Sequence, residues 1–266
     1  MFDNFLALWG LTPDGDPIIT RNSRLLPVRK NGVPAMLKIA GVAEEESGNA
    51  LMVWWNGDGA ASVLAHDGAA LLLERAGETR SLVAMAQSGQ DDQATCILCE
   101  SVARLHSPRN KPTPPLVPLK EWFRELQPVT DIHGGILRCS ADTARKLLED
   151  PQDVVALHGD IHHGNVLDFG ARGWLAIDPK GLHGERGFDY ANLFTNPDFD
   201  TATAPGRVGQ LANIVAQMAG IERERVLRWV LAWSGLSAAW HISKGDAADL
   251  PLTVAEIAAS ECSVAS

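Results

Sequence analysis

The stretch LHGDIHHGNVLDFGARGWLAIDP, Leu157–Pro179, is rich in side chains that do chemistry. Histidine or aspartate occupies four of the six positions in His158–His163. Asn165 follows closely, and Asp178 comes after a short apolar run. Imidazoles and carboxylates at such spacing can build a metal cage for a hydrolase. They can also belong to another kind of site, one that needs carboxylates and a single amide at fixed positions.

The composition is that of a soluble globular protein. The chain has 266 residues, which is enough for one large domain or for two modest domains that share a cleft. Hydrophobic residues make up 45% of it and charged residues 21%. Its formal net charge is -10. Binding to nucleic acid needs clustered Lys and Arg, so we expect no nucleic-acid partner. An acidic chain suits a cationic small-molecule substrate, although acidity for solubility alone is common.

The cysteines and apolar runs indicate neither a disulfide framework nor a membrane segment. Cys96 and Cys99 form a C-x-x-C pair inside DQATCILCESVARLH, which has helical spacing, so we predict buried helix residues there. The N-terminus lacks the basic region of a signal peptide, and no apolar run approaches the length of a membrane span. We expect a cytoplasmic protein without a membrane partner, acting as a monomer or homodimer.

The first third of the chain has the alternation of β-strands. SRLLPVRK and VPAMLKIA flank Asn31 and Gly32, a pair that accepts the positive φ angles of a tight hairpin turn. A second hairpin is predicted in ASVLAHDGAALLLERA, turning at Asp67 and Gly68. Between them, an acidic run that suits a helix N-terminus predicts a helix ending in GNALMVWW. Residues 1–75 should form a small, sheet-rich lobe.

Helical spacing dominates the remainder, residues 76–266. We predict helices in DDQATCILCESVARLH, in SADTARKLLED with Ser140 as N-cap, in GRVGQLANIVAQMAG and in RERVLRWVLAWSGLSAAWHIS. The join to the first lobe is expected in LLLERAGE. The predicted fold class is α+β, with a small β-rich lobe and a larger helical lobe.

Spacing within Leu157–Pro179, the central stretch, favours phosphoryl transfer over a metal cage. His158, Asp160 and Asn165 match the pattern H-x-D-x-x-x-x-N of kinase catalytic loops. In that loop the aspartate accepts the proton of the attacking hydroxyl, and the asparagine binds Mg²⁺. Asp178, after the turn DFGARG, would be the second metal ligand. A zinc cage that also used His183 would give no reason for Asn165.

An early strand supplies the lysine that such a site needs. Kinases grip the nucleotide phosphates with a strand lysine paired to a helix glutamate. Lys38 ends AMLK, at the lysine position of the signature V-A-I-K, and Glu44–Glu46 follow. The phosphate-covering loop departs from the protein kinases, because TRNSRLLP has no glycine. Ser23 is the phosphate contact expected from it.

Together these elements resemble the aminoglycoside phosphotransferases, relatives of the protein kinases. The resemblance to this family rests on the segments LHGDIHHGN, IDP and FDYANLF. A closer resemblance, to the group that acts on streptomycin and hydroxyurea, rests on WWNGDGAA, SGQDDQATCILCESVARLH and LSAAW. It covers the chain from about Arg24 to Trp240. The resemblance implies a two-lobed protein-kinase-like fold that uses ATP and Mg²⁺ to phosphorylate a hydroxyl of a small cationic antibiotic. It further implies streptomycin as the substrate and its 6-hydroxyl as the acceptor.

Further residues take expected roles from the same resemblance. Glu45 would pair with Lys38, and the main chain of Glu74 and Ala76 in LLLERA would contact adenine. The remaining three candidates are possible substrate contacts.

Glu185 would line an acidic pocket for guanidinium groups. Asp189 is expected to fix the loop by accepting backbone N–H groups, with a direct substrate contact as the alternative. Trp240 shares a helix face with Trp233, where core packing competes with stacking on a cation.

Other function classes stay open at this point. A metabolic kinase of the same fold would act on choline, a sugar or an amino alcohol. A non-catalytic nucleotide-binding module would bind without turnover, and a zinc hydrolase is the remaining alternative.

Overall fold

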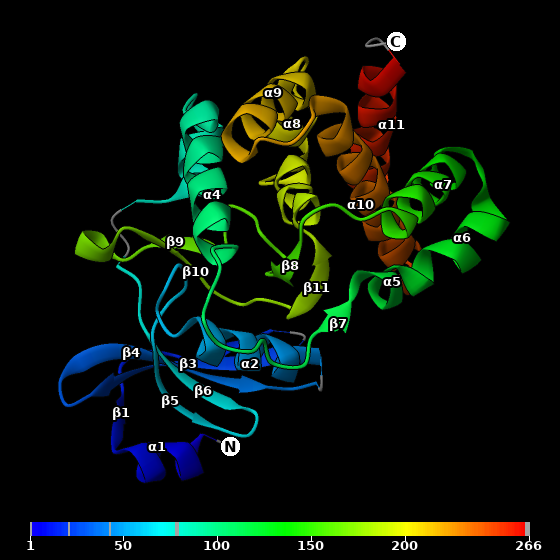
Figure 1. Cartoon of the computed structure of the whole chain (residues 1–266). Helices are drawn as coiled ribbons and strands as arrows, with labels where there is room; N and C mark the ends of the chain where they lie inside the picture. Colours follow the sequence, from blue (N-terminus) through cyan, green and yellow to red (C-terminus); the bar gives the residue numbers. More distant parts are fainter. Residues whose placement is uncertain (1, 21, 43, 78–79, 264–266) are drawn as a thin grey trace.

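The computed structural model describes residues 2–20, 22–42, 44–77 and 80–263, and it separates a sheet from a mainly helical part (Figure 1). The N-terminal strands lie at one end of the molecule, and α4, α6, α7 and α9–α11 lie toward the other. This is the α+β arrangement predicted from the sequence. Arg21, in the expected phosphate-covering loop, and the side chain of Glu44 lie outside the described residues.

The N-terminal sheet has six strands in the order β1-β3-β4-β6-β5, with β2 paired to β3. Asn31 and Gly32 turn between β3 and β4 with φ angles of 52° and 80°, which confirms the first predicted hairpin. The second hairpin turns one residue later than predicted, because Asp67 still pairs with Ala70. The strands are β1 (Leu11–Pro13), β2 (Ile18–Ile19), β3 (Ser23–Lys30), β4 (Val33–Ala40), β5 (Val63–Asp67) and β6 (Ala70–Glu74).

Helices lie on both faces of this sheet. The predicted helix α2 (Glu44–Trp55) lies between the sheet and the rest of the molecule in Figure 1. On the other face, α1 (Asp3–Trp9), for which no helix was predicted, packs Phe5, Leu6 and Trp9 against the apolar side chains of the sheet. β6 ends at Glu74, next to the lobe boundary expected between residues 75 and 76.

Beyond β6 the chain is mainly helical, as the spacing predicted. α10 carries buried residues along most of its length, from Val226 to Ala239, so it is the central helix of this part. The helices are α3 (Leu82–Gln87), α4 (Asp91–Leu105), α5 (Leu119–Trp122), α6 (Leu126–His133), α7 (Gly135–Glu149), α8 (Phe199–Ala202), α9 (Arg207–Ala219), α10 (Arg223–Lys244) and α11 (Asp249–Ser263). No helix within the described ranges is both long enough and apolar enough to span a membrane.

Ser140 is not a helix N-cap, contrary to the prediction. α7 begins at Gly135, and Ser140 lies inside it, fully buried. A β-carbon at Gly235 of α10 would lie 2.2 Å from the Ser140 β-carbon. A small residue on each helix therefore lets α7 and α10 approach closely, and this packing, rather than capping, explains Ser140.

Two short sheets hold the central stretch. β8 (Val154–Leu157) pairs with β11 (Leu182–Glu185), which also pairs with β7 (Val117–Pro118), and β9 (Val166–Asp168) pairs with β10 (Trp174–Ala176). Residues 158–165, the central loop, thus run from the end of β8 to the start of β9. Asp178 follows β10. The strand pairing places the central loop beside Asp178.

Candidate active site

His158 shapes the central loop by bonding to the main chain. Its Nε2 lies 2.8 Å from the Ile177 carbonyl, and its Nδ1 lies 3.2 Å from the Asp160 N–H. The ring is fully buried and stacks on Trp55 with 6.1 Å between ring centroids. Burial lowers the pKa of His158 to about 4, so the imidazole is neutral at physiological pH and can accept from Asp160 while donating to Ile177.

Asp189 fixes the same loop through hydrogen bonds to its main chain. Its carboxylate accepts the backbone N–H of His158 at 2.9 Å and that of Gly159 at 2.7 Å. His106 Nε2 lies 2.8 Å from the carboxylate, and the Asp189 side chain has no exposed surface. The alternative of a direct substrate contact is wrong for this geometry, because every approach to the carboxylate is filled by protein.

The carboxylate of Asp160 is oriented by two amide side chains. Asn192 Nδ2 donates to Oδ1 at 2.9 Å, and Asn165 Nδ2 lies 3.3 Å from Oδ2 and 2.9 Å from the Asp160 carbonyl. Asn192 is itself fixed by Trp233 Nε1, which donates to its amide oxygen at 3.1 Å. Sequence reasoning missed Asn192, although it follows Asp189 within FDYANLF. Burial raises the pKa of Asp160 to about 7, against the lowering effect of Lys180.

A cavity of about 890 Å³, the strand pocket, lies between the N-terminal sheet and the central stretch. Lys38 enters it from β4 and donates to Glu45 of α2 at 2.6 Å. Lys38 also contacts Asp178, whose φ of 59° is unusual for a non-glycine residue and marks local strain. The sequence-predicted residues that line this pocket are Ser23, Lys38, Glu74, Ala76, Asn165 and Asp178.

Glu45 was the expected partner of Lys38, and the structure brings the two side chains together. Glu45 is buried, whereas Glu46 is exposed. Ser23, expected on the phosphates, is buried and donates its hydroxyl to Glu45 Oε2 at 3.0 Å. In this position the Ser23 hydroxyl supports the Glu45 carboxylate, so it is not a free donor for a phosphate oxygen.

The main chain of Glu74 is already partly hydrogen-bonded within the protein. The Glu74 N–H donates to the Ser62 carbonyl at 3.0 Å, and its side chain contacts Arg172. The main-chain group that Glu74 can offer a ligand is therefore its carbonyl. Ala76 lies two residues on, past the end of β6, and lines the same pocket.

The oxygen donors of the strand pocket suit Mg²⁺ better than zinc. Asn165 turns its amide nitrogen to Asp160, which leaves its amide oxygen for another partner. Burial tends to raise the pKa of Asp178, but Lys38 and Lys180 outweigh it and hold that pKa below its usual range, so the carboxylate is ionised. One amide oxygen and one carboxylate fit Mg²⁺, which fills its shell with water and phosphate oxygens.

The imidazoles considered for a zinc cage do not converge on one point. His158 bonds to the main chain, and His183 is exposed on β11. Within the described part of the chain, no three His, Cys, Asp or Glu side chains gather as a metal site requires. The residues of the alternative zinc cage therefore do not come together among the described residues.

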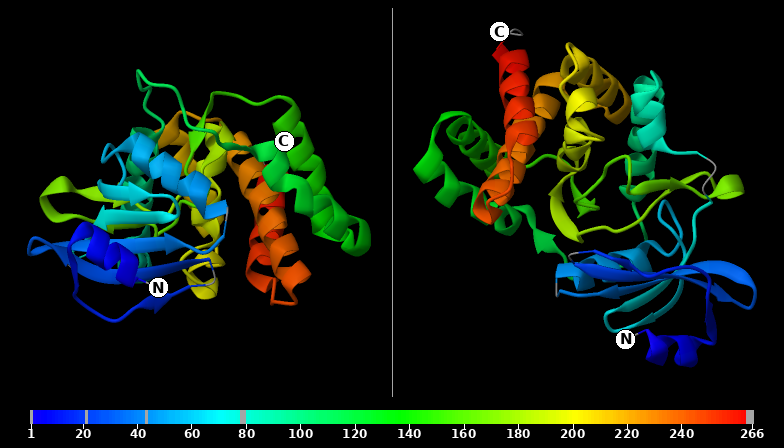
Figure 2. Two further views of the ribbon diagram at one scale, coloured as in Figure 1. Left: turned by 90° about the horizontal axis from the view of Figure 1, so that it is seen from below. Right: turned by 180° about the vertical axis from the view of Figure 1, so that it is seen from behind.

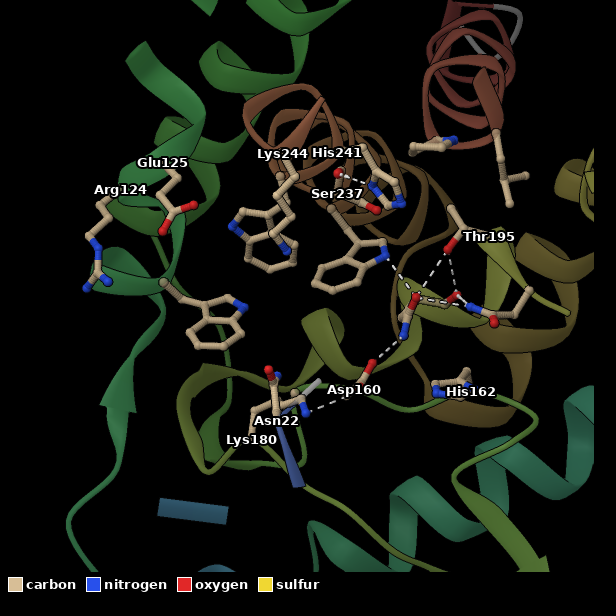
Figure 3. A pocket seen from close by; sticks show the side chains of 18 of the residues that line it. Asn22, Arg124, Glu125, Asp160, His162, Lys180, Thr195, Ser237, His241 and Lys244 are labelled. Atoms are coloured by element: carbon tan, nitrogen blue, oxygen red, sulfur yellow. Dashed lines mark hydrogen bonds and ion pairs between the residues drawn. The ribbon is translucent and has the colours of Figure 1, made fainter. Parts of the chain in front are cut away.

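Asp160 lines a second cavity of about 800 Å³, the tryptophan pocket (Figure 3). Trp240 packs edge-to-face on Trp122 and Trp233, with 5.5 Å and 5.6 Å between ring centroids. Trp240 is partly exposed to the cavity and belongs both to the core and to the pocket wall. Glu121 and Glu125 add carboxylates to the rim.

Glu185 does not line either pocket, contrary to its expected place in an acidic substrate site. Only 3% of the residue is exposed. Its carboxylate accepts from Arg225 at 2.6 and 2.7 Å, from Trp229 Nε1 at 2.7 Å and from the Gln152 N–H at 3.0 Å. A buried carboxylate must be paired, and here Arg225 of α10 supplies the opposite charge, so Glu185 is structural.

The central loop lines both cavities, with Asp160 at the tryptophan pocket and Asn165 at the strand pocket. This arrangement is expected of a kinase. The fold agrees with that class. The aminoglycoside phosphotransferase APH(3'')-Id from Streptomyces rimosus superimposes with a TM-score of 0.59 and 19% identity, covering 89% of this chain and 98% of that one. At this identity the likeness concerns the fold alone, and it defines a protein-kinase-like fold.

Sequence comparison identifies the family. The family model described as aminoglycoside/hydroxyurea antibiotic resistance kinase matches residues 8–245. The streptomycin 3''-kinase of Klebsiella pneumoniae is 53% identical over 242 residues, 89% of this chain and 91% of that relative. The streptomycin 6-kinase of Streptomyces glaucescens is 32% identical, over 96% of this chain and 86% of that relative. The chain belongs to the aminoglycoside/hydroxyurea antibiotic resistance kinases, as the resemblance predicted.

Proposed function

We propose that this protein transfers the γ-phosphoryl group of ATP to a hydroxyl of streptomycin, with Mg²⁺ as cofactor. One observation carries the proposal. Asp160 lines the tryptophan pocket, with one carboxylate oxygen bonded to Asn192 and the other near Asn165, which lines the strand pocket. A nucleotide in the strand pocket and an acceptor in the tryptophan pocket would meet at this carboxylate.

The chemistry assigned to Asp160 follows from its position. The acceptor hydroxyl donates to the carboxylate, which directs the hydroxyl oxygen at the γ-phosphorus. The bond from that oxygen to phosphorus forms as the bond from phosphorus to the bridging oxygen of ADP breaks, and the hydroxyl proton passes to Asp160. Phosphoryl transfer needs little covalent help, so holding the hydroxyl in line is the main contribution.

Lys38 and Glu45 are assigned to the nucleotide. The Lys38 side chain in the strand pocket can contact phosphate oxygens, and its bond to Glu45 fixes its direction. Asn165 and Asp178 would hold Mg²⁺, which neutralises charge on the phosphates when bound. The main-chain groups near Glu74 and Ala76 remain the proposed contacts for adenine.

The acceptor is assigned from the tryptophan pocket and from the relatives. Indole rings attract cations through their faces. Arg124 pairs with Glu121 at 3.3 Å, so Glu125 is the rim carboxylate that we assign to a cation. A guanidinium-bearing antibiotic such as streptomycin matches that chemistry. Choline, a sugar and a simple amino alcohol lack its several cationic groups.

For the acceptor hydroxyl, we propose the 3'' position rather than the 6 position expected from the resemblance. The 3''-kinase is the relative at 53% identity, whereas the 6-kinase of Streptomyces glaucescens is at 32%. The 6-hydroxyl stays as the second candidate, because both kinds of kinase match over most of the chain.

An acceptor panel tests the proposal. ADP release with Mg²⁺ and ATP should depend on streptomycin and stay at background with choline, simple sugars and hydroxyurea. Two-dimensional NMR of the purified product then locates the phosphate. Phosphorylation of choline or a sugar instead of streptomycin would overturn the substrate, and phosphorylation at the 6-hydroxyl would overturn the position alone.

A further inference from the structure

We propose that Lys180 contacts the transferred phosphoryl group and stabilises its negative charge as it passes to the acceptor. This inference rests on the proposed phosphotransferase function. Sequence reasoning assigned no role to Lys180, which follows the IDP motif. A fixed cation at the point of transfer is the part that kinases and GTPases supply with lysine or arginine.

Lys180 lines the tryptophan pocket and contacts carboxylates on both sides of the proposed transfer path. Its Nζ is 3.8 Å from Asp160 Oδ2 and 3.1 Å from Glu45 Oε1. Asp160 faces the acceptor side, and Glu45 is bonded to Lys38 on the nucleotide side. In Figure 3, Lys180 and Asp160 lie at one end of the tryptophan pocket, whereas Arg124 and Lys244 project well away from Asp160. Lys180 is thus the pocket-lining lysine beside the proposed transfer path.

The backbone that carries Lys180 is locked to both parts of the molecule. The Lys180 N–H donates to the His158 carbonyl at 2.7 Å, which fastens it to the central loop. On the other side, α2 approaches so closely that a β-carbon on Gly48 would lie 1.9 Å from the Pro179 carbonyl oxygen. A β-carbon on Gly181, whose φ is 68°, would lie 2.5 Å from the main chain of Ser47. The lysine therefore starts from a fixed base, and only its side chain needs to move.

Glu45 does not need Lys180 to remain in place. Glu45 Oε2 accepts from Lys38 at 2.6 Å and from Ser23 at 3.0 Å, whereas Lys180 bonds to the other oxygen, Oε1. Lys180 can turn from Glu45 to a phosphoryl oxygen while the Lys38–Glu45 pair stays intact. An ammonium has three donors, so one can reach the phosphoryl group while another stays near Asp160.

Opposite charges surround the Lys180 ammonium. It faces Glu45 and Asp160, and Asp178 pairs with Lys38 close by. Two lysines, Lys38 and Lys180, therefore face three carboxylates at the junction of the pockets. Lys180 keeps its protons throughout the reaction, since the hydroxyl proton goes to Asp160.

Three variants test the role: Lys180→Met, Lys180→Arg and, as a matched control on the exposed face of α7, Lys146→Met. With streptomycin as acceptor, we expect Lys180→Met to lower kcat by about 10²- to 10³-fold, the usual effect of removing one transition-state donor. KM for ATP and for streptomycin should change little. Lys180→Arg should recover part of kcat, and the control should match wild type.

A second measurement separates a contact in the transition state from an indirect effect. ADP, Mg²⁺ and aluminium fluoride mimic a phosphoryl group in transit, and together with streptomycin they should inhibit wild type tightly. Lys180→Met should lose this inhibition while its affinity for ADP alone, by calorimetry, stays the same. An equal loss of ADP affinity would assign Lys180 to nucleotide positioning and overturn the proposal.

Two further results would also overturn it. One is a Lys180→Met enzyme with the kcat of wild type. The other is a Lys180→Arg enzyme that is folded by thermal melting yet no more active than Lys180→Met. Wild type that turns over another acceptor but not streptomycin refutes the substrate alone, and the same variants are then compared with that acceptor. Wild type without turnover on any acceptor refutes both proposals.

Discussion

Replacing Asp189 by asparagine tests the claim that a buried carboxylate sets the shape of the central loop. The carboxylate accepts two backbone N–H groups, at 2.9 Å from His158 and 2.7 Å from Gly159. Asparagine offers one oxygen and one N–H₂ group, so one of these backbone donors loses its acceptor and faces another donor. His106 also loses the negative charge beside it.

The cost can be estimated from these contacts. A buried donor without an acceptor costs about 1–3 kcal/mol, and weakening the remaining bond from charged to neutral adds about 1 kcal/mol. We therefore expect Asp189→Asn to lower the free energy of unfolding by about 2–4 kcal/mol. A shift of the loop by about 1 Å would also move Asp160 and lower kcat by about 10²-fold.

Urea denaturation and steady-state kinetics measure the two effects. Asp153→Asn is the matched control, because Asp153 pairs with Arg186 at the surface, 3.0 Å away, with 69% of its side chain exposed. Exposed pairs contribute about 0–1 kcal/mol, so the control should stay near wild type in both assays. If Asp189→Asn is as stable as wild type and raises only KM for streptomycin, then Asp189 contacts substrate and the reasoning is wrong.

Three further predictions concern the pockets and pH. Lys38→Met should lower kcat/KM for ATP by about 10- to 100-fold, as expected for the loss of a charged hydrogen bond to phosphate; an unchanged value would remove Lys38 from the nucleotide site. Trp240→Ala should raise KM for streptomycin by about 5- to 30-fold, the range of a cation–π contact, with kcat kept; a fall in kcat alone would speak against the contact. Burial lowers the pKa of His158 and His163 to about 4. Below about pH 6.5 the unfolded state therefore binds more protons than the folded state. The free energy of unfolding falls as the pH falls toward 4. Each such histidine costs about 2 kcal/mol between pH 7 and pH 5, and His162 shifts in the same direction, whereas the raised pKa of Asp160 returns about 2 kcal/mol. Urea unfolding at pH 5 should therefore show a net loss of about 4 kcal/mol relative to pH 7, and equal stability at the two values would contradict it.

Local patterns predicted much of the fold. Asn31 and Gly32 predicted the first hairpin turn because few other pairs accept two positive φ angles. The helical spacing of DDQATCILCESVARLH predicted α4, since its buried side chains recur on one face. Ser140 failed as a cap because a serine that packs against glycine in a helix crossing looks the same in sequence as one that begins a helix.

The candidate site was predictable where residues lie close along the chain. The spacing of His158, Asp160 and Asn165 placed three side chains in one loop, and their contacts follow from that loop. Asn192 was missed because its bond to Asp160 depends on how a distant turn packs.

The wrong expectation for Glu185 and the omission of Lys180 have the same origin. Glu185 was expected in a pocket, but burial against Arg225 cannot be read from an acidic residue in a sequence. Lys180 was overlooked because its place beside Asp160 depends on the pairing of β11 with β8 and on the contact of α2 with Pro179. Tertiary contacts of this kind carry no local signal.

The central claim is that Asp160 directs a hydroxyl of streptomycin at the γ-phosphorus of ATP. Mass spectrometry of streptomycin after incubation with ATP, Mg²⁺ and either wild type or Asp160→Asn tests it most directly. We predict that wild type adds the mass of one phosphoryl group, and that Asp160→Asn does so about 10²- to 10⁴-fold more slowly, the usual contribution of a positioned base. Unmodified streptomycin with wild type, or equal rates for the two enzymes, would contradict the account.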